Sequence, residues 1–159
     1  MAEYPITQDQ RTFNEQLEVR EDIGNYYVSL LGLRKYTTHE LLQLVQKGMP
    51  YTTFERFARN SSIPREQLHL LLQLPLRTLQ RRKREGALHS DESDRLLRAA
   101  RVFAKAVALF EGDYEAAQSW FTSSLASLGG SSPLEFASSE LGAREVEAII
   151  SRLEHGIAI

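Results

Sequence analysis

The sequence predicts an all-α protein, and three observations lead to this prediction. From Thr37 onward, apolar residues recur three or four positions apart, which is the period of a helix with one buried face. These stretches are separated by residues that typically begin or end helices. The sequence contains no alternation of apolar and polar residues bounded by turns, which is the pattern that would predict a strand. Hydrophobic residues at 42% and charged residues at 25% of the 159 positions are typical of a globular chain, which excludes a fibrous or fully disordered protein.

The N-terminal part lacks this helical period. Residues 1–25 are polar and rich in Gln, Glu and Asp, so we expect a mobile tail. Residues 26–33 are apolar enough to dock on the folded body, in an extended form, and Gly32 is expected to break any helix there.

Four short helices are expected between Thr37 and Gly86, because capping residues and prolines alternate with apolar clusters. Pro64 suits a first helical turn, and the Leu74–Pro75 step separates the third helix from the fourth. The expected helices begin at Thr37 or Thr38, at Thr52 or Thr53, near residue 65 and at residue 76.

Four further helices are expected in the second half of the chain. Ser90 is a suitable N-cap for a long helix, because acidic residues follow in the first turn, where the helix dipole favours them. Trp120 and Phe121 have the spacing of core residues. The expected helices run from Ser90 to about Phe110, from Asp113 to Gly129, from Ser132 through Phe136, and from about residue 142 to 154.

The charge of the chain is divided into three blocks. Residues 1–33 carry two Arg against six acids, a net charge of −4, and residues 106–159 carry two Arg against eight acids, a net charge of −6. Between them, residues 34–105 carry fifteen Lys and Arg against seven acids, a net charge of +8. This division favours a polyanionic partner for the middle and a protein partner for an end, and the alternative is a chance fluctuation of charge.

Two short helices joined by a tight break, at about 65–73 and 76–85, have the outline of a helix-turn-helix. Leu68, Leu72 and Leu79 fall where such a unit buries apolar side chains, which leaves a cationic face outward. The side chains expected to contact DNA are Arg77, Thr78, Gln80 and Arg81 at base edges, and Arg82, Lys83 and Arg84 at phosphates.

The helix-turn-helix pattern has two departures. His69 stands where a small residue is usual, and Gln73 stands where the turn usually has Gly. The alternative interpretation of the cations is a solvated basic face or a salt-bridge partner for the acidic tail. For Arg95 and Arg98 we expect bracing ion pairs with Asp91 or Asp94 rather than contacts with phosphate.

Seven short segments occur in the order expected of one known family. They are Leu-Leu-Gly-Leu (30–33), Arg-Thr-Leu-Gln-Arg-Arg (77–82), Ser-Asp-Arg-Leu-Leu-Arg-Ala-Ala-Arg-Val (93–102), Ala-Ala-Gln-Ser-Trp-Phe (116–121), Leu-Gly-Gly-Ser-Ser-Pro-Leu (128–134), Glu-Leu-Gly-Ala-Arg-Glu-Val-Glu (140–147) and His-Gly-Ile-Ala (155–158). Together they resemble the antitoxins of the Xre/MbcA/ParS family, the partners of RES-domain toxins. The resemblance spans about four-fifths of the chain.

The resemblance implies a helix-turn-helix domain over residues 26–89 and a toxin-binding domain over residues 90–159, after the tail of residues 1–25. It implies a partner toxin that consumes NAD, an antitoxin that blocks the toxin's NAD site, a homodimer, and repression of its own operon through operator DNA. One departure is Thr-Ser-Ser at 122–124, where the family often has Pro before the Leu-Gly-Gly stretch, and it concerns the end of that helix.

The C-terminal end is expected to insert at or near the toxin's NAD cleft. An apolar tripeptide follows the stop at Gly156, so it either folds back or enters a partner. The residues expected to contact the toxin are Arg144, Glu147, Arg152, Glu154, His155, Ile157, Ala158 and Ile159.

No catalytic site is predicted. The four histidines lie on separate segments without the spacing of metal ligands, and there is no cysteine and no glycine-rich phosphate loop, so we expect no metal and no cofactor. We also expect no membrane segment and a cytoplasmic location, because no apolar run or signal peptide is present.

Two other functions remain compatible with the residues. One is a stand-alone helix-turn-helix transcription regulator without a toxin. The other is a protein-interaction module that has lost DNA binding, which the missing turn glycine permits.

Overall fold

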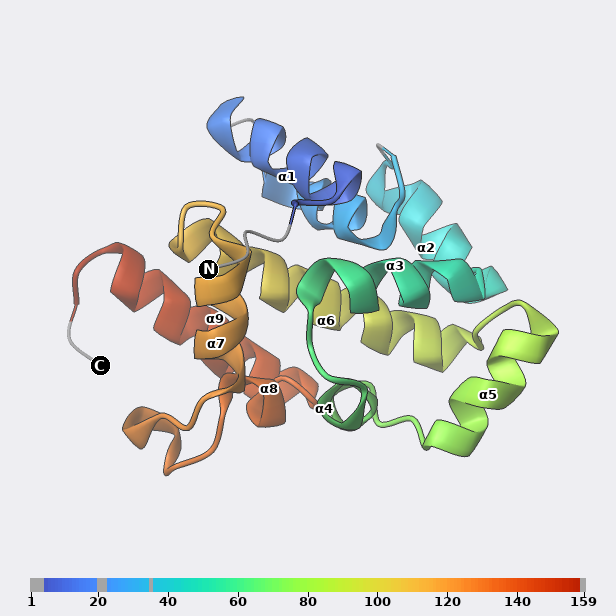
Figure 1. Cartoon of the computed structure of the whole chain (residues 1–159). Coiled ribbons are helices and arrows are strands. Elements are labelled where there is room, and N and C mark those ends of the chain that lie inside the picture. Colours follow the sequence, from blue (N-terminus) through green and yellow to red (C-terminus); the bar gives the residue numbers. More distant parts are fainter. Residues whose placement is uncertain (1–4, 20–22, 35, 158–159) are drawn as a thin grey trace.

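The computed structural model describes residues 5–19, 23–34 and 36–157, which form helices joined by short loops (Figure 1). The all-α prediction is confirmed, and the β-type pairing found in these residues is an isolated bridge between Pro50 and Ala87. Within the same residues, no helix is both long and apolar enough to cross a membrane. The elements are α1 (Gln8–Val19), the 3-10 helix η1 (Ile23–Leu31), α2 (Thr38–Lys47), α3 (Tyr51–Ser61), α4 (Arg65–Leu71), α5 (Leu76–Glu85), α6 (Ser90–Leu109), α7 (Tyr114–Thr122), the 3-10 helix η2 (Ala126–Leu128), α8 (Pro133–Phe136) and α9 (Glu140–Glu154).

Helix α6 is the central element of the fold. It packs against η1, α2 and α3 on the N-terminal side and against α7 and α9 on the C-terminal side. The Phe103 ring on α6 lies 6.1 Å from Phe57 of α3 and 5.6 Å from Phe121 of α7, both edge to face. All three rings are fully buried, so one aromatic column joins the two halves of the chain.

The expectation of a mobile N-terminal tail is wrong for residues 8–19. These residues form α1, which packs on η1, and Phe13 is 99% buried. Leu17, one turn later, also packs on the core, so a narrow apolar stripe anchors a helix that is otherwise polar. Residues 1–4 and 20–22 of the expected tail lie outside the described part of the chain.

A polar clasp also holds α1 in place. The Asp9 carboxylate accepts hydrogen bonds from Nε and Nη2 of Arg56, each at 2.8 Å, and from Nδ2 of Asn60 at 2.9 Å. The hydrogen bonds from Arg56 lower the pKa of Asp9, against the opposing effect of burial. A long-range ion pair of this kind adds directional contacts to the apolar docking of α1.

Residues 26–33 dock on the body as expected, but not in an extended form. They belong mostly to η1, in which Val28, Leu30 and Leu31 are buried. Gly32 follows with a φ of 71°, in the left-handed region that favours glycine.

Three of the predicted capping residues are observed at helix starts. Thr37, Asp113 and Ser132 are N-caps whose side chains accept from a backbone N–H in the first turn, and Thr37 and Ser132 form complete capping boxes. The starts expected near residues 52, 65 and 76 lie within two residues of those observed.

Three expected boundaries are wrong. The N-cap of α6 is His89 rather than Ser90, and α9 begins earlier than expected, after the N-cap Ser139. Helix α7 ends at Thr122, so Leu125 lies beyond it. The hydroxyl of Thr122 donates to a backbone carbonyl one turn back, a local bond that competes with continuation of the helix.

Candidate functional site

Helices α4 and α5 form the predicted helix-turn-helix. Leu68 and Leu71 of α4 and Leu79 of α5 are buried. Gln73, at the position where Gly is usual, has a φ of 52° and takes the left-handed conformation itself. The turn is therefore built without glycine, at the cost of some backbone strain.

Helix α5 projects from one end of the molecule, on the right in Figure 1. Most of the α5 side chains predicted to contact DNA are exposed to solvent. Four of them are Arg or Lys, so this helix has a strongly positive face. The exposed ones are Arg77, Gln80, Arg81, Lys83 and Arg84, and Thr78 is half-buried.

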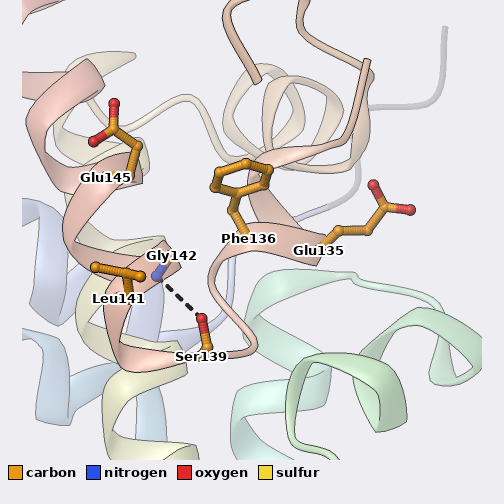
Figure 2. Close-up of a pocket in the computed structure, with 6 residues that line it drawn as sticks. All are labelled: Glu135, Phe136, Ser139, Leu141, Gly142 and Glu145. Carbon is orange, nitrogen blue, oxygen red and sulfur yellow. Dashed lines mark hydrogen bonds between the residues drawn. The ribbon is translucent and has the colours of Figure 1, made fainter. Parts of the chain in front are cut away.

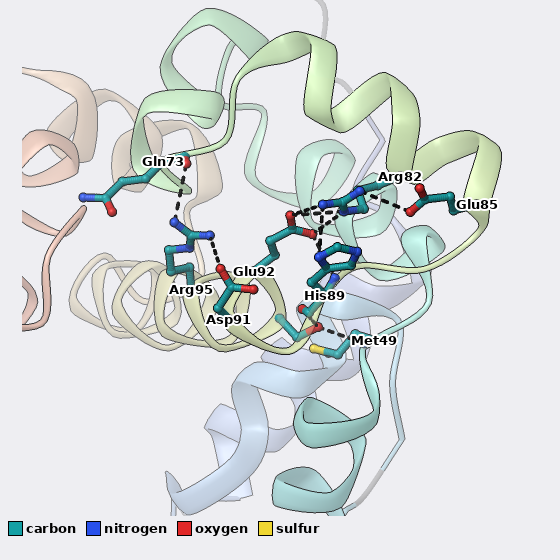
Figure 3. Close-up of polar contacts among 9 residues, drawn as sticks. Met49, Gln73, Arg82, Glu85, His89, Asp91, Glu92 and Arg95 are labelled. Carbon is teal, nitrogen blue, oxygen red and sulfur yellow. Dashed lines mark hydrogen bonds and ion pairs between the residues drawn. The ribbon is translucent and has the colours of Figure 1, made fainter.

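The expectation that Arg82 meets phosphate is wrong, because this guanidinium is 95% buried. Its Nε donates to the Glu92 carboxylate at 2.8 Å and its Nη2 donates at 2.9 Å, which is a two-point pair (Figure 3). Glu85 accepts from Nη1 at 3.2 Å, and Nδ1 of His89 lies 3.1 Å from Nη2. Arg82 lies three residues after Leu79, on the same inner face of α5.

The Arg82–Glu92 pair joins α5 to the first turn of α6. Burial by itself raises the pKa of Glu92, but the hydrogen bonds from Arg82 and from the backbone N–H of His89 outweigh it and leave the pKa low. Ser93, in the same turn, accepts from the backbone N–H of Met49 at 2.8 Å. The beginning of α6 is therefore fixed to the body on one side and to α5 on the other.

The ion pairs expected of Arg95 and Arg98 with Asp91 and Asp94 are present, but they lie within α6 and do not themselves join the two halves. Arg95 pairs with Asp91 at 3.0 Å and Arg98 with Asp94 at 3.3 Å, each one turn away on α6. Arg95 also donates to the carbonyl of Gln73 in the helix-turn-helix turn at 3.5 Å, as Figure 3 shows.

A ladder of ion pairs joins α6 to α9. Arg98 donates to Glu140 at 2.9 Å, Arg101 donates to Glu147 at 2.8 Å, and Lys105 lies 3.3 Å from the same Glu147 carboxylate. Glu147 was expected at the rim of a toxin contact, but its side chain is only 17% exposed and is already paired with two cations. Its place in the structure is between α6 and α9.

The C-terminal end of α9 lies far from α5 (Figure 1). His155 is exposed, and its Nδ1 lies 2.6 Å from the carbonyl of Ser151. Ile157 is 56% exposed after the helix stop, and Ala158 and Ile159 lie outside the described residues. The other predicted toxin-contacting residues that lie on the surface are Arg144, Arg152 and Glu154.

Among the described residues, two hollows border the C-terminal helix α9. One of about 410 Å³ is bounded by α1, α6 and α9, and its floor includes Phe13, Ala104 and Ile150. The other, of about 520 Å³, lies between α8 and α9. Among residues 5–19, 23–34 and 36–157, no three acidic or histidine side chains gather to hold a metal ion.

Comparison with known proteins identifies both halves. Residues 40–101 match a family model described as the antitoxin Xre-like helix-turn-helix domain, and residues 105–156 match the antitoxin Xre/MbcA/ParS C-terminal toxin-binding domain. An Antitoxin Xre of Yersinia enterocolitica is 34% identical over 128 residues, which are 80% of this chain and 86% of the relative. The chain belongs to the Xre antitoxin family.

Other Xre antitoxins are similar to this one. The Antitoxin Xre of Photorhabdus laumondii is 31% identical over 128 residues, with the same coverage of 80% and 86%. The Antitoxin Xre of Pseudomonas putida is 33% identical over 87 residues, 54% of each chain. These matches confirm the resemblance and the order of a DNA-binding helix-turn-helix domain followed by a toxin-binding domain.

The two family models meet inside α6. The first ends at residue 101 and the second begins at residue 105, so this antitoxin uses one helix in both domains. The boundary expected from the sequence, between residues 89 and 90, lies at the N-terminal end of α6, about twelve residues before the point where the two family models meet.

The ion pair of Glu92 was not predicted, because an acid in the first turn of a helix is sufficiently explained by the helix dipole. A signal was present, because Leu79 and Arg82 have the spacing of one inner helix face. An arginine on an inner face requires a buried acid, and the nearest acids in the chain are Glu85 and those at the beginning of α6.

Proposed function

We propose that this Xre-family antitoxin neutralises an NAD-consuming RES-domain toxin by placing the end of α9 at the toxin's NAD site. The observation that carries the proposal is Ile157, an apolar side chain 56% exposed just after the last helix of the toxin-binding domain. Burial of such a side chain in a partner is favourable, because it removes apolar area from water. Ala158 and Ile159 continue this apolar end in the sequence.

The polar side chains around this end supply the rim of the proposed contact. Arg152, Glu154 and His155 are exposed on the last turns of α9, and Arg144 lies further back with 74% of its side chain exposed. A polar rim around an apolar centre is the usual composition of a protein interface. Glu147 is left out of this rim, because its carboxylate is held by Arg101 and Lys105.

We also propose that the antitoxin represses its own operon as a homodimer. The exposed cations of α5 suit a major groove, and two copies related by a two-fold axis would read a palindromic operator. We propose further that the protein has no catalytic activity of its own and that its activity lies in binding toxin and DNA.

Co-expression with the adjacent reading frame tests the toxin part. We expect the partner to co-purify with the antitoxin, and NAD to be lost when the partner is present without it. Deletion of residues 156–159 and the single change Ile157→Ser should both weaken neutralisation. Ile6→Ser is the matched control, because Ile6 is an exposed isoleucine at the other end of the chain. Full neutralisation by the truncated protein would refute the proposed insertion.

Salt-dependent binding to the upstream DNA tests the second part. Arg81→Gln should weaken DNA binding. The slope of log K against log salt concentration should also fall in magnitude by about one, because one exposed charge that would contact phosphate or a base edge is lost. Absence of binding even at low salt would favour the interaction module without DNA binding. Binding to DNA with no toxin partner would favour the stand-alone regulator.

A further inference from the structure

The second hollow described above, of about 520 Å³, lies between α8 and the first turns of α9 (Figure 2). We call it the α8–α9 notch, and its lining residues are Glu135, Phe136, Ser139, Leu141, Gly142 and Glu145. It lies within residues 105–156, the matched toxin-binding domain. The C-terminal end of α9 lies at the other end of the same helix, about 20 Å away along its axis.

Local sequence fixes the shape of the notch. Ser139 caps α9 by accepting from the backbone N–H of Gly142 at 3.0 Å, as Figure 2 shows. A Cβ at Gly142 would overlap the carbonyl of Phe136, so only glycine lets α8 approach α9 this closely. The close approach of α8 and α9 at the notch therefore depends on glycine at position 142.

Leu141 stands at the mouth of the notch with 82% of its surface exposed. It is more exposed than any other large apolar side chain among residues 5–17, 27–34 and 36–157, whose exposure the structure describes. The half-buried ring of Phe136 lies across from it on α8 (Figure 2). An exposed leucine beside an aromatic ring in a concave site is typical of a protein interface.

The rim of the notch is acidic. Glu135 and Glu145 lie on opposite sides of Phe136 and are both exposed (Figure 2). The neighbouring Arg144 is paired with Glu140 at 3.3 Å, and Arg152 reaches Glu145 only at 3.9 Å. The rim therefore presents negative charge to any partner.

This charge decides between the possible occupants. A second copy docked with the two-fold axis through the notch would bring the acidic rims of the two copies together, which repel. Nucleic acid is repelled for the same reason. A protein surface with an apolar side chain flanked by Lys or Arg complements both the apolar floor and the acidic rim.

We propose that the α8–α9 notch is a second docking point for the toxin, where Leu141 and Phe136 receive an apolar side chain of the toxin and Glu135 and Glu145 pair with its flanking cations. This inference rests on the proposed function, because it assumes that a toxin binds this domain. Two contact points on one helix would fix the direction of α9 and thereby aim its C-terminal end.

The affinity of the full-length antitoxin for the purified product of the adjacent reading frame tests the notch. Leu141→Ser should weaken binding about tenfold or more, which is the range of a central interface leucine. Leu42→Ser is the matched control, because Leu42 is an exposed leucine on α2, outside the toxin-binding domain. Because Leu141 is so exposed, Leu141→Ser should leave the thermal unfolding midpoint unchanged.

A charge reversal provides a second, independent measurement. Glu145→Lys should weaken toxin binding and reduce its salt dependence, because an attractive charge of the rim becomes repulsive. Glu135 is left unchanged, because its carboxylate completes the capping box of α8 with Ser132. Unchanged affinity in both the leucine and the charge variants would overturn the proposal. A changed oligomeric state with unchanged toxin affinity would overturn it too, by assigning the notch to a contact between copies. If the wild-type protein binds no toxin at all, the proposed function fails and the notch proposal fails with it.

Discussion

The two ends of this antitoxin hold their exposed helices by different means. In α5 only Leu79 and Arg82 are buried, and the Arg82 side chain pairs with Glu92 of α6. Helix α9 has a wholly apolar inner face, and its ion pairs with α6 run along a half-exposed edge.

The two helices should therefore respond differently when one of these contacts is lost. A buried charge without its partner is strongly unfavourable, whereas a half-exposed pair is screened by water and contributes little. The orientation of α5 therefore depends strongly on one ion pair, while that of α9 is determined by many contacts. A perturbation at the start of α6 should reach α5 more strongly than α9.

The largest effect is expected from Arg82→Leu. This change leaves the Glu92 carboxylate buried without a cation and should lower the free energy of unfolding by about 3–5 kcal/mol, as measured by urea denaturation. Arg81→Leu is the control, because Arg81 is exposed one position away and its loss should change stability by about 0.5 kcal/mol or less.

The double change Arg82→Leu/Glu92→Leu separates charge burial from packing. With both charges removed, most of the lost stability should return, since an apolar pair often replaces a buried ion pair without loss. The remaining deficit should be about 1 kcal/mol, because Glu92→Leu also removes the hydrogen bond from the backbone N–H of His89. If the double variant is as unstable as the single one, the pair matters through its shape and hydrogen bonds rather than through charge.

Acid provides a second, smaller test of the same pair. Burial alone would raise the pKa of Glu92, but Arg82 and the backbone N–H of His89 hold it below its ordinary value of 4.5. The unfolded chain therefore takes up this proton at a higher pH than the folded chain does. The stabilisation is complete above about pH 4.5 and is lost as the pH falls through the lower pKa of the folded state. Urea denaturation between about pH 5 and pH 3 should show a steeper loss in the wild type than in the double variant, and equal slopes would contradict this.

A third prediction concerns the beginning of α9. Alanine usually stabilises a helix relative to glycine, but at Gly142 its Cβ would overlap the carbonyl of Phe136. Gly142→Ala should therefore lower the free energy of unfolding by about 1–3 kcal/mol, the usual cost of overpacking. Gly86→Ala is the comparison, because Gly86 has open space and loses only its favourable left-handed conformation. Greater stability of Gly142→Ala would contradict the close approach of α8 and α9.

The sequence was sufficient to predict the helices and the helix-turn-helix, because these depend on local signals. The apolar period, the caps Thr37, Asp113 and Ser132, and the bracing arginines act within a few residues. Helix α1 was missed because its stripe contains only a few apolar residues, among them Phe13 and Leu17, and because its clasp to Arg56 joins residues far apart in the chain.

The candidate sites were less predictable, because exposure depends on the tertiary fold. In the sequence Arg82 is one of five consecutive charged residues, and nothing local separates it from its neighbours. Its burial against Glu92 of α6 is evident only in the folded structure. Glu147 reads as a surface acid, and its burial depends on Arg101 and Lys105 about forty residues earlier. The α8–α9 notch follows from the close approach at Gly142, which no local pattern indicates.

The smallest effect is expected in the ladder between α6 and α9. Glu147→Gln removes the pairs with Arg101 and Lys105, yet the cations remain partly exposed to water, so the free energy of unfolding should fall by about 1 kcal/mol or less. Glu154→Gln is the control, because Glu154 is an exposed acid two turns later on α9. DNA affinity should be the same in both variants, because the inner face of α9 keeps its apolar packing. A loss above about 2 kcal/mol would mean that the ladder acts as a cooperative network, and the two ends of the molecule would then be held in the same way.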